Sequence, residues 1–129
     1  MKNILLLIIT GIILNACNND PKQKLIGEWK EYWGIGEETD VNYNSINKIQ
    51  LNSDGNFVIT RVTGNDYLFD KIVFDGTELS FREENTSDPN EKFFVYYKLK
   101  LINDAKWMEG SIINSRGKTA NLKWEKIKQ

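Results

Sequence analysis

The sequence has no histidine and a single cysteine, Cys17, among its 129 residues. Histidine is the commonest general base and metal ligand at neutral pH, and one cysteine forms neither an internal disulfide nor a zinc cluster. These two absences exclude most metalloenzymes and histidine-dependent catalytic triads. Only 2 prolines and 9 glycines are present, against 4 Trp, 5 Tyr and 6 Phe, which argues against disorder and collagen and favours a strand-rich core.

An excess of one charge is absent too, since 17 Lys and Arg residues balance 18 Asp and Glu residues for a formal net charge of -1. No basic patch stands out, so we expect no nucleic-acid partner. The motifs of serine hydrolases, dinucleotide-binding proteins and phosphate loops are missing. The adjacent carboxylates Glu83 and Glu84 point to opposite faces of a strand, the wrong arrangement for a glycosidase pair. We therefore expect no enzyme, no metal and no cofactor.

The N-terminus does carry a distinctive signal. Lys2 precedes an apolar run, residues 4–14, that is shorter than the about 20 residues of a membrane-spanning helix. The run ends at Leu14 and is followed by Asn15, Ala16 and Cys17. These four residues resemble the signal of bacterial lipoproteins. The resemblance implies that residues 1–16 are a signal peptide and that Cys17 is lipidated, with palmitate among the attached fatty acids. The alternative is an uncleaved anchor in which Cys17 is an ordinary residue.

The lipoprotein resemblance also implies a location and an organisation. The protein is expected on a membrane of the bacterial cell envelope, such as the outer membrane, on its periplasmic or surface side. Residues 17–24 comprise the lipidated cysteine and a polar segment that indicates a tether, and residues 25–129 form one domain. The membrane is thus an expected partner, and the lipid on Cys17 is expected to attach the protein to it.

The domain shows the pattern of an all-β protein. From Leu25 onward apolar residues alternate with period two, and turn signals recur about every ten residues. Each strand has one apolar face, which favours an antiparallel up-and-down β-barrel of about eight strands, because closure removes exposed edges. The predicted strands are 25–33, 46–52, 57–63, 67–74, 78–83, 92–102, 106–113 and 118–127.

Two blocks of the sequence are similar to a known family. Gly27, Glu28 and Trp29 resemble the Gly-x-Trp opening strand of lipocalins and other calycin-type barrels. Residues 97–127 are similar to the last three strands of lipocalin-like domains in bacterial lipoproteins. The resemblance implies a lipocalin-like barrel with a cavity for a ligand and with Trp29 at the closed end. The arginine that packs on this tryptophan in lipocalins has no clear counterpart in the sequence.

Six residues are candidates for binding a small, hydrophobic ligand. Apolar ligands bind concave aromatic surfaces with few polar anchors, although the same aromatics equally fill the core of a small barrel. Glu31 and Arg61 share faces with aromatic residues, so they either anchor a ligand head group or lie near strand ends and reach water. The candidates are Glu31, Trp33, Phe57, Arg61, Phe81 and Tyr97.

A second hypothesis is a protein-interaction module of the envelope, either an enzyme inhibitor or an assembly factor. Phe94 and Tyr96 are expected on the outer face of the barrel. The segments 34–45 and 84–91 are expected to form loops, and long loops at a barrel mouth often recognise partners. The acidic residues of the first loop lack the spacing of an EF-hand, which favours a solvated loop over a calcium site.

Overall fold

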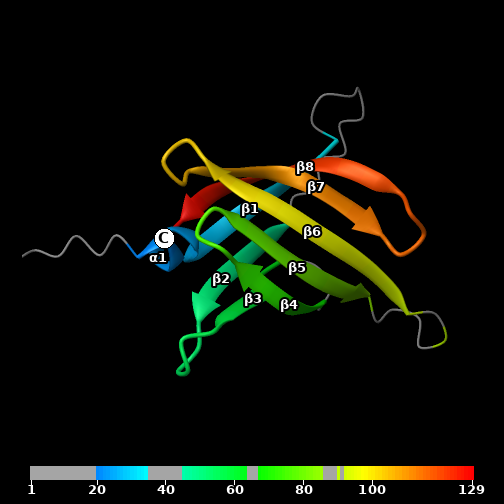
Figure 1. Ribbon diagram of the computed structural model, residues 1–129, viewed down its shortest axis with the longest axis horizontal. Coiled ribbons are helices and arrows are strands. Elements are labelled where there is room, and N and C mark those ends of the chain that lie inside the picture. Colours follow the sequence, from blue (N-terminus) through cyan, green and yellow to red (C-terminus); the bar gives the residue numbers. More distant parts are fainter. Residues whose placement is uncertain (1–19, 35–44, 64–66, 86–89, 91) are drawn as a thin grey trace, which may run out of the picture.

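The computed structural model describes residues 20–34, 45–63, 67–85, 90 and 92–129. The described chain contains one short helix and eight strands (Figure 1). Every strand predicted from the alternation pattern is present, with ends that differ by at most two residues. The elements are α1 (Pro21–Leu25), β1 (Gly27–Trp33), β2 (Ile46–Leu51), β3 (Phe57–Arg61), β4 (Leu68–Phe74), β5 (Glu78–Asn85), β6 (Phe93–Ile102), β7 (Trp107–Asn114) and β8 (Thr119–Lys128).

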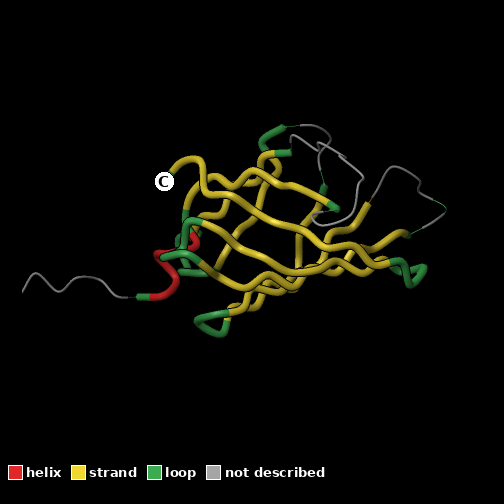
Figure 2. The backbone as a smooth tube through the Cα atoms, turned by 90° about the horizontal axis from the view of Figure 1, so that it is seen from above, coloured by secondary structure: helices red, strands yellow, loops and turns green. Residues whose placement is uncertain are grey.

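The strands form a single antiparallel sheet in the order β3-β2-β1-β8-β7-β6-β5-β4. The sheet curls into a nearly closed barrel, and β3 and β4 are its two edges (Figure 2). Side chains bridge the seam between these edges. Phe57 meets Phe74 edge to face with 6.0 Å between ring centroids, and the Arg61 guanidinium lies 4.7 Å from the Tyr67 ring centroid. The predicted all-β up-and-down barrel is confirmed.

The inward-facing positions of the strands form one hydrophobic core. Trp29 is fully buried, which confirms the core position expected for it. Burying large apolar side chains from water is the main force that holds such a barrel together. The buried hydrophobic residues are Leu25, Trp29, Ile49, Ile59, Phe69, Leu79, Phe81, Val95, Tyr97, Leu99, Met108, Ile112, Leu122 and Trp124.

The helix α1 closes one end of the barrel. It overlaps the predicted tether, residues 17–24, and ends at Leu25, the first residue of the predicted domain. Asp20 caps the helix by accepting a 3.0 Å hydrogen bond from the backbone N–H of Lys22, and proline occupies its first turn. Leu25 is fully buried, and its carbonyl oxygen accepts a 2.8 Å hydrogen bond from the indole N–H of Trp29.

A cation from the last strand covers Trp29. The Lys126 ammonium lies 4.9 Å from a ring centroid of this tryptophan and donates to the carbonyl oxygen of Lys24 at 2.5 Å. Partial burial lowers the pKa of Lys126. Lys126 thus connects β8 both to the ring of Trp29 and to the backbone of α1.

No helix among the described residues is long and apolar enough to span a membrane. The predicted signal peptide and Cys17 lie outside the described residues.

Candidate functional site

The end of the barrel opposite α1 carries a group of partly exposed aromatic residues, and we call it the distal end. β1 and β3 finish there, at Trp33 and Arg61, and β6 begins there (Figure 1). Trp33, Tyr67 and Phe93 are half-buried at this end and pack against the core. Part of each side chain remains exposed, although the guanidinium of Arg61 lies over the ring of Tyr67 and that of Arg116 over the ring of Phe93.

A buried carboxylate lies just beneath these aromatics. Glu31 is 1 % exposed and accepts hydrogen bonds from the indole N–H groups of Trp33 and Trp124 at 2.6 and 2.8 Å. The side-chain amide of Asn47 donates a third bond at 3.4 Å, and the guanidinium of Arg61 lies 3.8 Å away. Glu31 thus accepts hydrogen bonds from Trp33, Trp124 and Asn47, and it forms an ion pair with Arg61.

Arg61 connects Glu31 to a second carboxylate. Its Nη2 atom lies 3.3 Å from Oε2 of Glu83, and its Nε–H donates to the Asn47 side-chain oxygen at 3.2 Å. The same Glu83 oxygen accepts a 2.6 Å hydrogen bond from the hydroxyl of Tyr97. We call Glu31, Asn47, Arg61, Glu83 and Tyr97 the polar network.

The polar network holds two carboxylates against one guanidinium in a water-poor environment. Burial raises the pKa of Glu31, opposed by the hydrogen bond from Trp33, the charge of Arg61 and the hydrogen bond from Trp124. Burial, followed by the nearby Glu31 and Glu83, raises the pKa of Tyr97 well above its ordinary value, which keeps its hydroxyl a donor. The positive charge of Arg61 thus compensates the negative charges of the two buried carboxylates.

Aromatic rings fill the barrel interior next to the network. Tyr97 and Phe81 are stacked with centroids 4.4 Å apart, and Trp124 lies 5.5 Å from Phe81. Phe69 completes the group at 5.7 Å from Phe81. Each buried side-chain nitrogen or oxygen in the described part of the chain has a hydrogen-bond partner. The described interior therefore consists of packed rings and internally satisfied polar groups.

The structure brings most of the predicted ligand-binding residues together. Glu31, Arg61 and Tyr97 belong to one network, Trp33 donates to it, and Phe81 stacks on Tyr97. The interpretation in which Glu31 and Arg61 reach water is wrong, because their side chains are 1 % and 9 % exposed.

Phe57 lies apart from this group. It is the first residue of β3, at the end where Lys22 of α1 lies 6.0 Å from its ring centroid. Its position follows from strand direction, since the two ends of β3 lie at opposite ends of the barrel. Of the predicted loops, residues 35–44, 86–89 and 91 lie outside the described residues.

Asn47 and Glu83 are network residues that were not among the predicted ligand-binding residues, and Glu83 was considered only as a partner of Glu84 in a glycosidase pair. The alternation pattern does indicate that both residues face inward, because Asn47 shares a strand face with Ile49, and Glu83 shares one with Phe81. A polar residue on an otherwise apolar strand face indicates a buried polar cluster.

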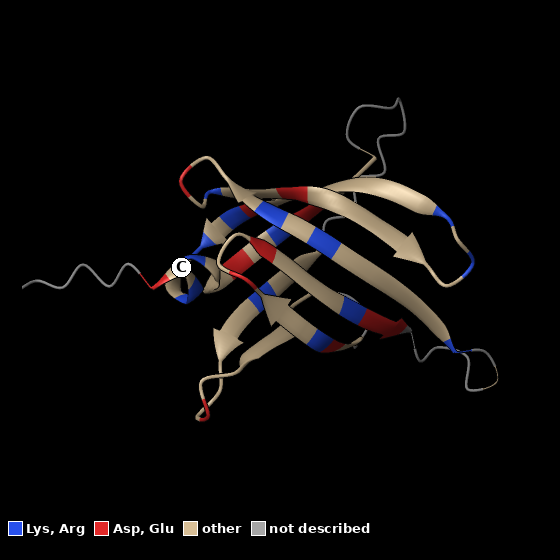
Figure 3. Cartoon of the chain, in the orientation of Figure 1, with Lys and Arg blue, Asp and Glu red and all other residues tan. Residues whose placement is uncertain are grey.

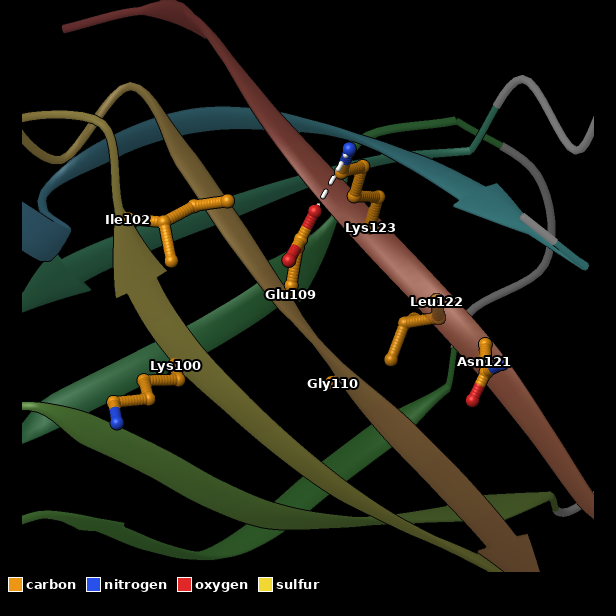
Figure 4. Close-up of a pocket in the computed structure, with 7 residues that line it drawn as sticks. All are labelled: Lys100, Ile102, Glu109, Gly110, Asn121, Leu122 and Lys123. Atoms are coloured by element: carbon orange, nitrogen blue, oxygen red, sulfur yellow. Dashed lines mark ion pairs between the residues drawn. The ribbon is translucent and has the colours of Figure 1, made fainter. Parts of the chain in front are cut away.

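Further hollows lie on the outside of the barrel. One of about 410 Å³ lies over β6, β7 and β8, where Lys123 and Glu109 form a 2.8 Å ion pair (Figure 4). Gly110 lines it, and a Cβ there would lie 1.7 Å from the carbonyl oxygen of Lys98, so only glycine allows the two strands to approach this closely. Among the described residues no group of three or more Asp, Glu, His or Cys side chains is placed to hold a metal ion.

Comparison of the chain with protein-family models, with curated proteins and with solved structures finds no match. The features that bear on function are therefore the geometry of the distal end and the signals in the sequence.

Proposed function

We propose that the protein is a lipid-anchored protein of the bacterial cell envelope whose barrel binds a small, hydrophobic ligand without catalysis. The observation that carries this proposal is the group of half-buried aromatics Trp33, Tyr67 and Phe93 above the polar network at the distal end. Concave or rim-like aromatic surfaces with a few fixed polar groups are typical of small-molecule sites.

The chemistry of the network supports an apolar ligand. Its carboxylates and guanidinium are already hydrogen-bonded to one another, so what the distal end offers a ligand is mainly aromatic surface. Packed rings occupy the interior below, at Phe81 and Tyr97. The ligand therefore lies at the distal end, in contact with Trp33, and does not penetrate the centre of the barrel.

The first test is the presence of a ligand and its dependence on Trp33. Native mass spectrometry of the protein purified from its host is expected to show a discrete added mass. Trp33→Ala is expected to lower the ratio of bound to free protein about tenfold, because an aromatic contact contributes up to about 1.5 kcal/mol. Trp107→Ala is the matched control, since Trp107 lies on the outer face against Tyr32. No added mass in the wild type, or equal losses in both variants, contradicts the proposal.

The second test concerns the anchor. Cys17→Ser is expected to abolish incorporation of a clickable palmitate analogue and to leave the signal peptide attached, because only a thiol accepts the diacylglyceryl group. Ser115→Ala, a substitution at the other end of the chain, serves as a control that keeps Cys17. Undiminished labelling of the Cys17 variant contradicts the lipoprotein proposal.

A protein-interaction module is the second candidate function. The observation that favours it is the exposure of Leu68 and Val73, 56 % and 61 %, on the outer face of the edge strand β4. An edge strand with exposed apolar side chains is suited to pair with a partner strand. Co-purification of a stoichiometric envelope protein that is lost in Leu68→Ser, with no bound small molecule, would favour this function over ligand binding.

A further inference from the structure

A second hollow lies on the outer face of β5, β6 and β7, away from the distal end and from the barrel interior. Its volume is about 320 Å³. None of the described residues that line it is acidic, although the chain as a whole is almost neutral. The lining residues are Lys71, Ser80, Phe81, Arg82, Tyr96, Tyr97, Lys98, Ser111 and Ile113.

Strand register distinguishes Lys98, which lines this hollow, from Lys100, the next lysine on the same strand. Lys98 is paired with Ser80 on β5 and with Ser111 on β7. These three side chains form one row across three strands, with neighbouring strands about 4.8 Å apart. The row therefore places Lys98 between two residues with hydroxyl side chains, and an oxyanion beside Lys98 can accept hydrogen bonds from its ammonium and from one of the two hydroxyls.

The next lysine on the same face has the opposite surroundings. Lys100 is paired with Glu78 on one side and with Glu109 on the other. Residues with carboxylate side chains therefore flank Lys100, whereas residues with hydroxyl side chains flank Lys98. Both lysines are exposed residues of β6 and lie two positions apart on one face of the strand; the lysines of this strand are coloured blue in Figure 3.

A strained backbone position brings a second cation to the hollow. Lys71 has φ of 52°, a left-handed conformation that non-glycine residues rarely adopt. It lies in a bulge of β4 where the register shifts between Asp70 and Val73. Bulges redirect side chains, and here the bulge makes Lys71 part of the hollow.

The third cation of the hollow is fixed in place. Arg82 donates from Nε to Asp70 at 2.7 Å, and its guanidinium lies 4.3 Å from the Phe94 ring centroid. Asp70 compensates its charge, so Arg82 shapes the wall of the hollow, while Lys71 and Lys98 provide the attraction for an anion.

An apolar wall stands beside the row of donors. Tyr96 and Ile113 are cross-strand partners one row away from Lys98, and they are 44 % and 46 % exposed. Large apolar side chains that remain this exposed next to a hollow offer contact area to a ligand. The hollow thus combines donors for an oxyanion with a surface for an apolar or ring-shaped body.

We propose that this hollow is a binding site for a small organic oxyanion, a phosphate, sulfate or carboxylate carried on an apolar body. Lys98 holds the anionic group together with the hydroxyl of Ser80 or of Ser111, and Lys71 adds a second positive charge. Tyr96 and Ile113 contact the body. This site is independent of the ligand proposed for the distal end.

The test is an NMR titration of the full-length, ¹⁵N-labelled chain in a non-ionic detergent at low salt. Phenyl phosphate is the probe, and inorganic phosphate and phenol are its two separate parts. Phenyl phosphate is expected to shift the amides around Ser80, Lys98 and Ser111 saturably, with Kd on the order of 1 mM for a ligand of this size. Each part alone is expected to bind at least about fivefold more weakly: phenol loses an ion pair that contributes up to about 1 kcal/mol, and inorganic phosphate loses the apolar contact with Tyr96 and Ile113. Benzoate and phenyl sulfate then rank the three oxyanions.

Matched variants locate the site. Lys98→Ala is expected to weaken phenyl phosphate binding about fivefold, while Lys100→Ala, on the same exposed face, changes it less than twofold. Lys71→Gly removes the second charge and relieves the strained backbone, so it is expected to weaken binding while preserving the fold. Absence of saturable shifts, equal losses in the Lys98 and Lys100 variants, or equal affinity for inorganic phosphate would overturn the proposal.

Discussion

Arg61→Met is expected to lower the free energy of unfolding by about 3–5 kcal/mol, measured by denaturant titration at pH 7. Methionine fills much of the same space, but it leaves Glu31 and Glu83 buried without their cation. It also removes the bond from Arg61 to Asn47 and the contact with the Tyr67 ring across the seam. A loss of this size is a large part of the about 5–15 kcal/mol that stabilises a small domain.

The loss in Arg61→Met is expected to depend on pH. Arg61 lowers the pKa of Glu31, so its removal raises that pKa further above the ordinary value. A carboxyl group with a raised folded-state pKa contributes stability below its unfolded pKa, about 4.3, and that contribution is lost as pH rises through the folded value. The deficit of the variant is therefore expected to be smaller near pH 4 than at pH 7. An equal deficit at both pH values would show that lost packing, and not unpaired charge, causes the effect.

Two companion variants separate charge from packing. Adding Glu83→Gln to Arg61→Met removes one of the two unpaired carboxylates, so the double variant is expected to recover part of the stability at pH 7. Lys48→Met is the matched surface control, because Lys48 is exposed on the outer face of β2 and its loss is expected to cost less than about 0.5 kcal/mol.

The strands of this protein could be predicted because their alternation is regular. Each strand has one buried face, so a shift of one residue would expose the whole apolar set, and this fixes both the strand and its orientation. Trp29 and Tyr97 show the principle, since each occupies an inward position in the alternating pattern of its strand and both are buried. Glu83 and Glu84 likewise have opposite orientations, one buried and one partly exposed.

The polar network could be predicted only in part, because its contacts cross the interior between strands that are not neighbours in the sheet. Arg61 on β3 meets Glu83 on β5, and alternation gives the face of each residue without giving its partner. The bulge at Lys71 is a second example, since nothing in the run around it predicts a left-handed lysine. The helix α1 did carry a recognisable signal, the capping residue Asp20 followed by Pro21, but five residues are too few to show periodicity.

The closed end of the barrel depends on Trp29, and Trp29→Ala is expected to lower the free energy of unfolding by about 3–5 kcal/mol. The side chain is fully buried, so its removal leaves a cavity that the surrounding strands close only partly. The variant also leaves the buried carbonyl of Leu25 without its donor and the Lys126 ammonium without its ring. An unpaired buried acceptor adds about 1–3 kcal/mol, which places the variant at or beyond the upper end of that range.

Two further substitutions give this prediction its controls. Trp29→Phe keeps most of the apolar volume but loses the hydrogen bond to Leu25, so it is expected to lower the free energy of unfolding less than Trp29→Ala does. The difference between the two variants then reports the contribution of the buried volume, because both lack the hydrogen bond. Trp107→Ala changes the same residue type on the outer face, where the ring is partly exposed and lies 6.2 Å from Tyr32, and is expected to cost about 1 kcal/mol or less. Because Leu25 docks α1 against the barrel, the Trp29 variants are also expected to speed proteolysis at Lys22 and Lys24, which trypsin detects directly. Near-native stability of Trp29→Ala, with unchanged cleavage in this segment, would contradict the role assigned to Trp29 in closing the barrel.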